Sequence, residues 1–294
     1  MIIEKLFNFL PPSFKDKARK IKEKKSLKQS EKLKQEQIIS KETIKELLNS
    51  FDISDDLFVH TSLRNIGYAL EGGKNTVIEA IKECINLDKN TLLLSALPFR
   101  TTMKEYLDNT SFLDMRSAPN AMGVVNNAFM SMPGTLRSLH PTHSAIALGI
   151  HAKEYIDEHH LDFTPFSEHS PYYKLWKNGG KILLFGVGLD SMTFTHVPED
   201  MLGENFPFKV YLKKQYIVKV IDFNGNEVEV CTYCHDPKLS AIRNCESIRD
   251  YLINAGVMKT KSLGLSEVSL IDAKGYVDII NELLSKGKSI YGKF

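Results

Sequence analysis

Unbroken apolar runs alternate with stretches of helical periodicity along most of the chain. Strands buried on both faces of a sheet read as continuous hydrophobic segments, and such runs predict strands at 57–60, 91–97, 144–148 and 181–187. Apolar residues at the spacing of one helix face predict helices at 43–48, 77–85, 122–130, 151–160, 172–176, 248–255 and 274–284. Apolar and polar positions alternate from 209 to 233 around Asn224-Gly225, a dipeptide typical of hairpin turns. The pattern predicts an α/β fold with a central, mostly parallel sheet and an added β-hairpin region.

The first 39 residues have a different pattern from the rest. Residues 2–10 are apolar at helical spacing and end at two prolines, and residues 15–34 then hold ten Lys or Arg against three acidic residues. Such an amphipathic, basic segment fits an interfacial helix attracted to anionic lipid through residues 1–35, and it equally fits a solvated arm. We therefore expect residues 1–39 to be a basic amphipathic N-terminal arm and residues 40–294 to form one domain, with Ser40 as the N-cap of its first helix.

Composition and charge exclude several classes of protein. With 43% hydrophobic and 25% charged residues, the 294-residue chain has the balance of a globular protein. A formal net charge of +2 is too small to indicate nucleic acid as a partner. Four cysteines are too few for a disulfide framework, and no apolar run approaches the length of a membrane span. We expect a cytoplasmic protein.

The strongest candidate site follows the predicted strand at 181–187. Ligands of open α/β sheets bind at the carboxyl ends of strands, and this strand leads to Asp190-Ser191 and then to His196 and Glu199. If this segment is helical, the last two share one face. A histidine oriented by a carboxylate suits removal of a proton from an attacking amine. The alternative is that His196 only packs beside the following proline.

Three other features have both a functional and a structural interpretation. His140 before Pro141 is a second catalytic or substrate-binding candidate, although such a step at a strand entry is more often a structural turn. The hydroxyls of Thr61 and Ser62 could hold phosphate or act as a plain helix cap. The spacing Cys-Thr-Tyr-Cys-His at 231–235 matches haem attachment, but it ends an alternating strand pair, so we expect neither haem nor metal there.

The motifs of residues 40–285 resemble, in order, those of the aminoglycoside 3-N-acetyltransferases. The resemblance lies in HTSLRNIGY, EGG, AMG, PGTLRSLHPTHSAIALG, EHSPYYKLW and ILLFGVGLDSMTFTH. It implies a three-layer α/β/α sandwich, often dimeric, that transfers an acetyl group from acetyl-coenzyme A to an amine on a sugar ring. The domain at 40–294 would then be an acetyltransferase domain.

The resemblance also implies roles for particular residues. His196 would be the general base and Glu199 would orient it. The coenzyme would lie against Thr61, Ser62, Leu63, Ala121, Met122 and Gly123. The acceptor would lie against Asp190, Ser191, Glu168 and His140.

The sequence departs from the family pattern on the acceptor side. Residues 99–120 are more compact than in family members that act on aminoglycosides, Asn120 replaces a frequent Arg, and Met192 replaces a frequent Asn. Together with the basic arm, this leaves two acceptors: a nucleotide- or lipid-linked amino sugar of surface polysaccharide synthesis, or an aminoglycoside. A non-catalytic binding protein that docks through its basic arm is the rival hypothesis, whereas a serine hydrolase would need a GxSxG elbow that the chain lacks.

Overall fold

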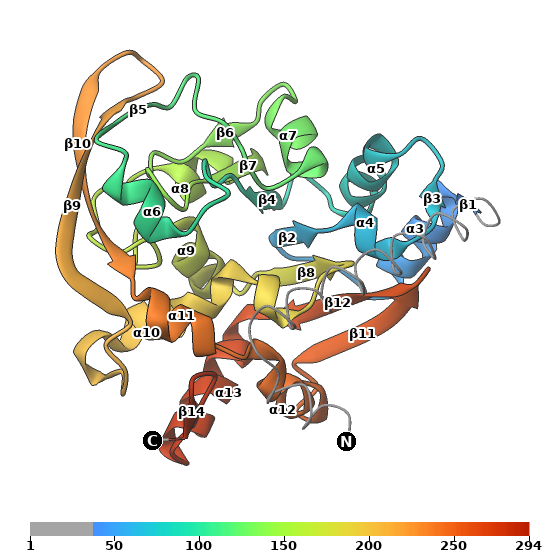
Figure 1. Ribbon diagram of the computed structural model, residues 1–294. Coiled ribbons are helices and arrows are strands. Elements are labelled where there is room, and N and C mark those ends of the chain that lie inside the picture. Colours follow the sequence, from blue (N-terminus) through green and yellow to red (C-terminus); the bar gives the residue numbers. More distant parts are fainter. Residues whose placement is uncertain (1–37, 294) are drawn as a thin grey trace, which may run out of the picture.

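A seven-stranded sheet forms the centre of the computed structural model, which describes residues 38–293 (Figure 1). In spatial order its strands are β11 (Met258–Leu263), β12 (Ser266–Asp272), β8 (Lys181–Phe185), β2 (Leu57–Thr61), β4 (Thr91–Ser95), β7 (Ala145–Gly149) and β6 (Leu136–Arg137). Only the central pairs β8·β2 and β2·β4 are parallel, and the outer pairs are antiparallel. The sheet is therefore mixed, whereas the sequence pattern predicted a mostly parallel one.

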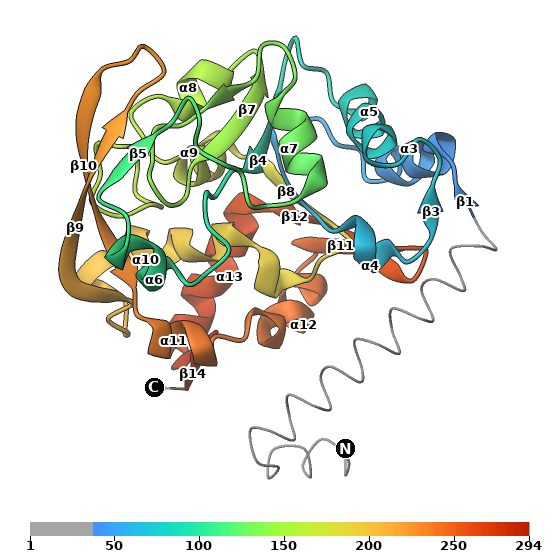
Figure 2. The ribbon, with the colours of Figure 1, turned by 45° about the horizontal axis from the view of Figure 1, so that its top comes forward.

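Helices cover both faces of this sheet, because successive strand residues point to opposite sides. Val59 and Leu183 face one apolar core, and their neighbours Phe58 and Ile182 face the other. The first core is covered by α3 (Lys41–Asn49), α5 (Lys74–Cys84) and α7 (Val124–Met130). The second is covered by α8 (Ala152–Ile156), α9 (Pro171–Asn178), α10 (Val197–Leu202), α12 (Arg249–Asn254) and α13 (Ala273–Ser285). Figure 2 shows the resulting three-layer α/β/α arrangement, which confirms the predicted fold class.

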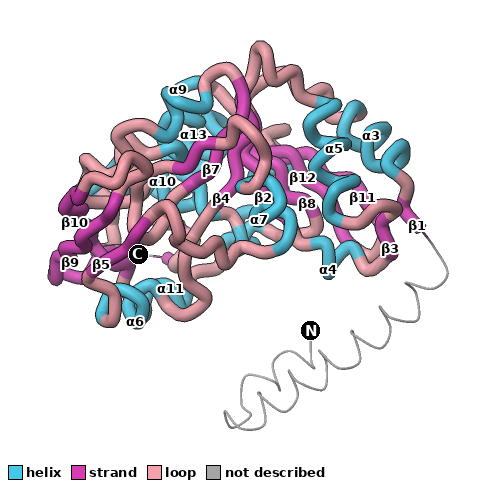
Figure 3. The backbone as a smooth tube through the Cα atoms, turned by 90° about the horizontal axis from the view of Figure 1, so that it is seen from above, coloured by secondary structure: helices cyan, strands magenta, loops and turns pink. Residues whose placement is uncertain are grey.

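A smaller sheet holds the predicted hairpin. The strand β9 (Tyr211–Ile221) pairs with β10 (Glu227–His235) in antiparallel fashion and with β5 (Phe112–Asp114) in parallel fashion. These strands pack with α6 (Met103–Asp108) on a third, small apolar cluster. Figure 3 places this sheet at the end of the molecule opposite to α3 and α5. The last strand of the hairpin, β10, carries His235 back toward the large sheet.

Several predicted boundaries differ from the structure. The hairpin of β11 and β12 was not predicted, because its strands are only partly apolar, yet it extends the sheet beside β8. The helix predicted at 151–160 ends at Ile156, where Asp157 is extended and Glu158 has a positive φ of 70°. The helix predicted from Met122 begins at Val124, since Gly123 has a φ of 114°.

The remaining elements are short. They are β1 (Ile38–Ile39), α4 (Leu63–Ile66), β3 (Ala69–Leu70), α11 (Pro237–Ile242), β13 (Lys288–Ser289) and β14 (Gly292–Lys293). Ser40 caps α3 as predicted, since its Oγ accepts a hydrogen bond from the backbone N–H of Thr43. The predicted arm lies outside the described residues except for β1. Within residues 38–293, every helix is too short or too polar to cross a bilayer.

Candidate active site

The candidate site is built on the chain that leaves β8. After Phe185 the backbone passes through two 3₁₀ turns, Leu189–Ser191 and Thr193–His196, and enters α10. The side chains of Leu189 and Phe194 are buried in the core and hold these turns in place. The turns therefore present Asp190 and Ser191 at the surface and direct His196 inward.

His196 and Glu199 form a buried hydrogen-bonded pair. The Nδ1 atom of His196 lies 2.7 Å from Oε2 of Glu199, and the two residues are 6% and 2% exposed. The hydroxyl of Tyr291 donates a hydrogen bond of 2.6 Å to the other carboxylate oxygen, Oε1. Burial alone would raise the pKa of Glu199, but the interactions with His196 and, to a smaller extent, His235 together outweigh it and lower that pKa well below its usual range. The pair is therefore a histidine oriented by an ionised carboxylate.

A second histidine, His235, lies against the first. The centroids of the two rings are 4.2 Å apart, and Nε2 of His235 is 3.6 Å from Oε2 of Glu199. This Nε2 atom is buried and has no hydrogen-bond partner in the described part of the chain. Burial and the neighbouring His196 lower the pKa of His235 to about 4, so its ring is neutral near pH 7. His235 was not among the predicted site residues. The one feature of the sequence that marked it was the Cys-Thr-Tyr-Cys-His segment at a strand end.

Among the described residues, His196, Glu199 and His235 are the one set whose ligand atoms are close enough for a metal ion, all within 4.8 Å of one another. However, Nδ1 of His196 and the Glu199 carboxylate already share a hydrogen bond of ordinary length. A metal on both atoms would have to displace that proton. The observed geometry is that of a histidine hydrogen-bonded to a carboxylate.

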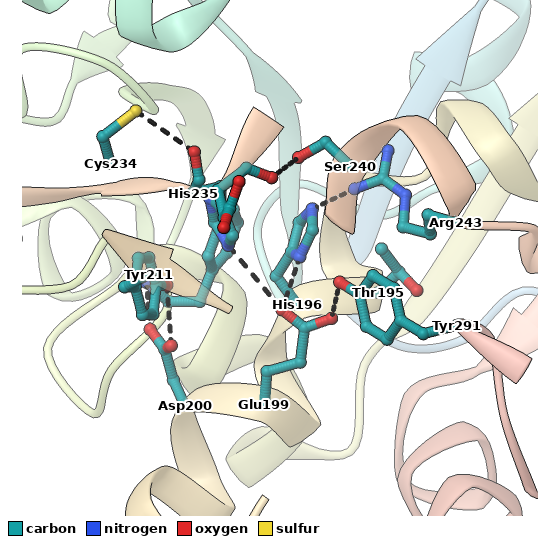
Figure 4. A network of polar contacts seen from close by, with 12 residues as sticks. Thr195, His196, Glu199, Asp200, Tyr211, Cys234, His235, Ser240, Arg243 and Tyr291 are labelled. Atoms are coloured by element: carbon teal, nitrogen blue, oxygen red, sulfur yellow. Dashed lines mark hydrogen bonds and ion pairs between the residues drawn. The ribbon is translucent and has the colours of Figure 1, made fainter. Parts of the chain in front are cut away.

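Arg243 approaches the opposite edge of the His196 ring (Figure 4). Its Nη1 atom lies 2.5 Å from Nε2 of His196. A guanidinium group can only donate hydrogen bonds, so Nε2 must be the acceptor and the ring proton must lie on Nδ1, where it is donated to Glu199. The imidazole is therefore neutral and its Nε2 lone pair faces away from the carboxylate.

This Nε2 edge borders a cavity of about 230 Å³. The cavity walls are formed by the segment between β4 and the start of α6, the loop before β7, the two 3₁₀ turns, the end of β10, and α11 with the residue that follows it. The lining residues are Leu97, Phe99, Met103, His143, Asp190, Ser191, Met192, Thr193, His196, His235, Ser240 and Arg243. The structure thus brings the predicted residues Asp190, Ser191 and His196 to one cavity.

The two predicted coenzyme loops lie at the ends of neighbouring strands. Thr61, Ser62 and Leu63 follow β2, and the backbone N–H of Ser62 donates to the carbonyl of Phe185 at the end of β8. Ala121, Met122 and Gly123 precede α7, and the backbone N–H of Ala121 donates to the carbonyl of Leu97, which lines the cavity.

A second cavity, of about 530 Å³, opens beside the first of these loops. It is lined by Asn65, by Gly186–Gly188 after β8, and by the hairpin of β11 and β12. The side chain of Asn65 donates to the carbonyl of Gly186, which ties the two walls together. The unpredicted hairpin thus forms one wall of this cavity.

Two predicted acceptor residues do not reach the cavity. His140 is fully buried, its Nδ1 accepts hydrogen bonds from the backbone N–H groups of Thr142 and His143, and its ring stacks on His159 at 4.6 Å. Glu168 is exposed in the loop before α9. The structure therefore places His140 in the interior, and it leaves Glu168 outside the cavity wall.

Comparison with known proteins gives the same family across most of the chain. Residues 58–285 match the family model described as aminoglycoside 3-N-acetyltransferase. Aminoglycoside N(3)-acetyltransferase III of Salmonella sp is 26% identical over 263 residues, which cover 81% of this chain and 88% of the relative. Aminoglycoside N(3)-acetyltransferase VIII of Streptomyces fradiae is 31% identical over 159 residues, which cover 49% of this chain and 54% of the relative.

Solved structures agree with the fold. The aminoglycoside acetyltransferase AAC(3)-Xa superposes with a TM-score of 0.70 at 25% identity, covering 88% of this chain and 95% of that one. The binary complex of AAC-IIIb with coenzyme A also has a TM-score of 0.70, at 22% identity, and covers 85% of this chain and 97% of that one.

Proposed function

Because the chain belongs to the aminoglycoside 3-N-acetyltransferase family, we propose that it acetylates the amine of an amino sugar, with His196 as general base. The family consists of acyltransferases that use acetyl-coenzyme A as the acyl donor. The observation that carries the proposal for His196 is its Nε2 lone pair, which faces the cavity while Nδ1–H is held by Glu199.

The reaction requires the amine to lose a proton as it attacks the thioester carbonyl. The new C–N bond forms, the C–S bond breaks, and the amine proton passes to Nε2 of His196 while the coenzyme leaves as its thiolate. Glu199 stabilises the imidazolium that results, and Tyr291 fixes the other oxygen of that carboxylate. General-base assistance of this kind contributes about 10²- to 10⁴-fold to the rate.

The cysteines of the region support direct attack without an acyl-enzyme. Cys245 is buried near the site, its Sγ lies 3.5 Å from Oγ1 of Thr195, and burial raises its pKa to about 11. Burial also raises the pKa of Cys234 to about 11. Since the thiolate is the nucleophilic form, neither thiol is activated for attack on a thioester.

The coenzyme would bind through backbone groups of the loops Thr61–Leu63 and Ala121–Gly123, which flank the carboxyl ends of β2 and β4. Thr61–Leu63 lie at the end of the parallel strand β2, and Ala121 is hydrogen-bonded to Leu97 just after β4. Ligands of α/β folds bind at such carboxyl ends of strands. Asp190 and Ser191 would contact the acceptor at the rim of the 230 Å³ cavity. We extend no such role to His140, because it is enclosed by protein.

The acceptor remains one of two classes: a nucleotide- or lipid-linked amino sugar of surface polysaccharide synthesis, or an aminoglycoside. The first class accords with the basic arm at residues 1–39, which would contact a membrane beside the acetyltransferase domain at 40–294. A homodimer is part of the same proposal. A catalytically inactive protein that only binds the coenzyme is the rival, and the intact pair of His196 and Glu199 in a cavity favours the enzyme.

A thiol-release assay with acetyl-coenzyme A tests the proposal. The acceptor panel holds kanamycin, other aminoglycosides and nucleotide-linked amino sugars. We expect turnover of one class, and His196→Ala should lower kcat by about 10²- to 10⁴-fold without changing coenzyme affinity. Lys238→Ala is the control, because Lys238 is exposed on α11 and does not line the cavity. Coenzyme binding without acetylation of any amine would favour the binding-protein hypothesis.

A further inference from the structure

Arg243 is a cation at the cavity that has no anionic partner within residues 38–293. It follows α11 and is half-buried, and the hydrogen bond to Nε2 of His196 is the one that its side chain makes in this part of the chain. By contrast, Arg249 in the same segment is paired with Glu246 and Glu267. A guanidinium has five N–H donors, so most of the donors of Arg243 are left for a ligand.

The other charged groups of the cavity do not compensate this cation. Asp190 is the carboxylate among the lining residues, and its Oδ1 already accepts a hydrogen bond of 2.7 Å from the backbone N–H of Cys245. The carboxylate of Glu199 lies behind the imidazole of His196 and is held there by Tyr291. An acceptor with many amino groups would therefore meet one carboxylate and one guanidinium, which is a poor match for a polycation.

Arg243 also blocks the nitrogen of His196 that would accept the proton of the amine. A general base must come within about 2.6–3.2 Å of the proton-bearing atom, but Nη1 of Arg243 occupies that position on Nε2 at 2.5 Å. The guanidinium must therefore move before an amine can be deprotonated. A group on the acceptor that attracts Arg243 would select the acceptor and free the base in one step.

Resting on the proposed acetyl transfer, we propose that Arg243 binds an acidic group of the acceptor, so that the substrate is an amino sugar bearing a phosphate or a carboxylate. The planar fork of a guanidinium matches both groups in a bidentate manner. When the acidic group takes the guanidinium, Nε2 of His196 is left to accept the amine proton. An acceptor without an acidic group leaves Arg243 on the base.

The phosphates of the coenzyme offer the same chemistry from a second source. Two measured affinities distinguish an acceptor role of Arg243 from a coenzyme role: that of the inhibitory anion and that of coenzyme A. If Arg243 binds the acceptor, Arg243→Ala weakens the competitive inhibition by inorganic phosphate or glucuronate against the amine and leaves the Kd of coenzyme A unchanged. If Arg243 holds the coenzyme, its Kd rises and the proposal is overturned.

The kinetic experiment compares acceptors with and without an acidic group, and glucosamine with glucosamine 1-phosphate is the closest matched pair. The matched probes are glucosamine 1-phosphate, a nucleoside-diphosphate amino sugar, glucosaminuronic acid, neutral glucosamine and kanamycin, assayed with wild type, Arg243→Ala and Arg243→Lys. We expect Arg243→Ala to lower kcat/KM for the acidic acceptors by about 10- to 100-fold, with Arg243→Lys in between. The neutral and cationic probes should be unchanged or improved, because the base is uncapped. Lys238→Ala removes a cation from the same helix and should alter none of these values.

The outcomes separate the inference from the function on which it rests. Equal losses for acidic and neutral acceptors in Arg243→Ala would mean a structural role and would overturn the inference, while acetyl transfer itself stands. If no amine is acetylated, the proposed function fails. Calorimetric titration of glucosamine 1-phosphate then tests the acidic-group subsite by itself. Binding that disappears in Arg243→Ala supports the subsite, and binding that persists in this variant overturns it. Circular dichroism of each variant excludes misfolding as the cause.

Discussion

Two groups of buried histidines lie on the same side of the large sheet and differ in their partners. In the pocket group, His196 hydrogen-bonds to Glu199 and turns its other nitrogen to a cavity, with His235 beside it. In the interior group, His140 accepts from two backbone N–H groups, and His159 bonds to Ser138 and to the carbonyl of Pro165. Burial is common to both, so burial alone does not identify a functional histidine.

The difference lies in what the free nitrogen faces. Nε2 of His196 faces a cavity and the guanidinium of Arg243, whereas Nε2 of His140 is enclosed by protein and has no hydrogen-bond partner among residues 38–293. A carboxylate partner lets His196 carry a positive charge during a reaction, because the charge is compensated where it forms. The partners of His140 and His159 are neutral groups, which suit a fixed, uncharged ring.

The largest expected effect is on catalysis in the pocket group. Glu199→Gln keeps the size of the side chain but lets its amide donate to Nδ1, which moves the imidazole proton to Nε2 and blocks the base. We expect kcat to fall by about 10²- to 10⁴-fold, as for comparable changes of a carboxylate that orients a histidine. Steady-state kinetics and a coenzyme titration test this. Unchanged kcat would remove Glu199 from the mechanism, and Tyr291→Phe, which keeps the carboxylate, should have the smaller effect.

Low pH should destabilise the folded protein through both groups of buried histidines. Burial lowers the pKa of His235 to about 4 and that of His159 to about 3, from about 6.5 when unfolded. The unfolded chain then binds more protons, so the stability from each neutral ring is present above pH 6.5 and is lost as pH falls toward the folded pKa. For His235 the loss near pH 4 is on the order of 3 kcal/mol. Asp200 acts in the opposite sense, because burial raises its pKa to about 7 and favours folding below that pH.

Urea unfolding at pH 4.5 to 7.5 measures the net result. We expect the free energy of unfolding to fall below pH 6.5, and His235→Gln should make that fall shallower. A stability that is flat or increases toward pH 4.5 would contradict the assignment of neutral buried rings.

A smaller effect is expected on stability in the interior group. His140→Ala removes the acceptor for the backbone N–H groups of Thr142 and His143 and should cost about 1–3 kcal/mol of unfolding free energy. His140→Asn offers a carbonyl oxygen near the position of Nδ1 and should retain much of that stability. Activity per folded molecule and the KM for the amine should stay unchanged in both variants. A raised KM with normal stability would restore His140 as an acceptor residue.

The smallest effect is expected at Glu168, in the exposed loop before α9. Glu168 is exposed and does not line the cavity, so Glu168→Gln should change the stability by less than about 0.5 kcal/mol and leave kcat/KM unchanged. A loss specific to one acceptor would show that the loop before α9 closes over bound substrate.

The part of the site formed by residues close in the sequence could be predicted, whereas the part formed by distant residues could not. His196 and Glu199 could be predicted because they are three residues apart after a buried strand, and this spacing brings their side chains into contact on one helical face. Tyr291 contacts the same carboxylate from 92 positions away, and Arg243 reaches His196 from 47 positions away. No local pattern marks such partners. Likewise, β11 and β12 were missed because both strands are only partly apolar and carry a weak periodicity signal.

What the sequence by itself determined is the layered α/β architecture, from hydrophobic periodicity, the family, from the order of its motifs, and the pairing of His196 with Glu199, from short-range spacing. Only the tertiary structure decided which histidines meet a cavity, which strands at the edges run antiparallel, and which cation faces the base. His140 and His196 each stand near a proline in the sequence, and the packing of distant elements alone separates them. Long-range contacts depend on how whole faces pack, and this information is spread over the chain.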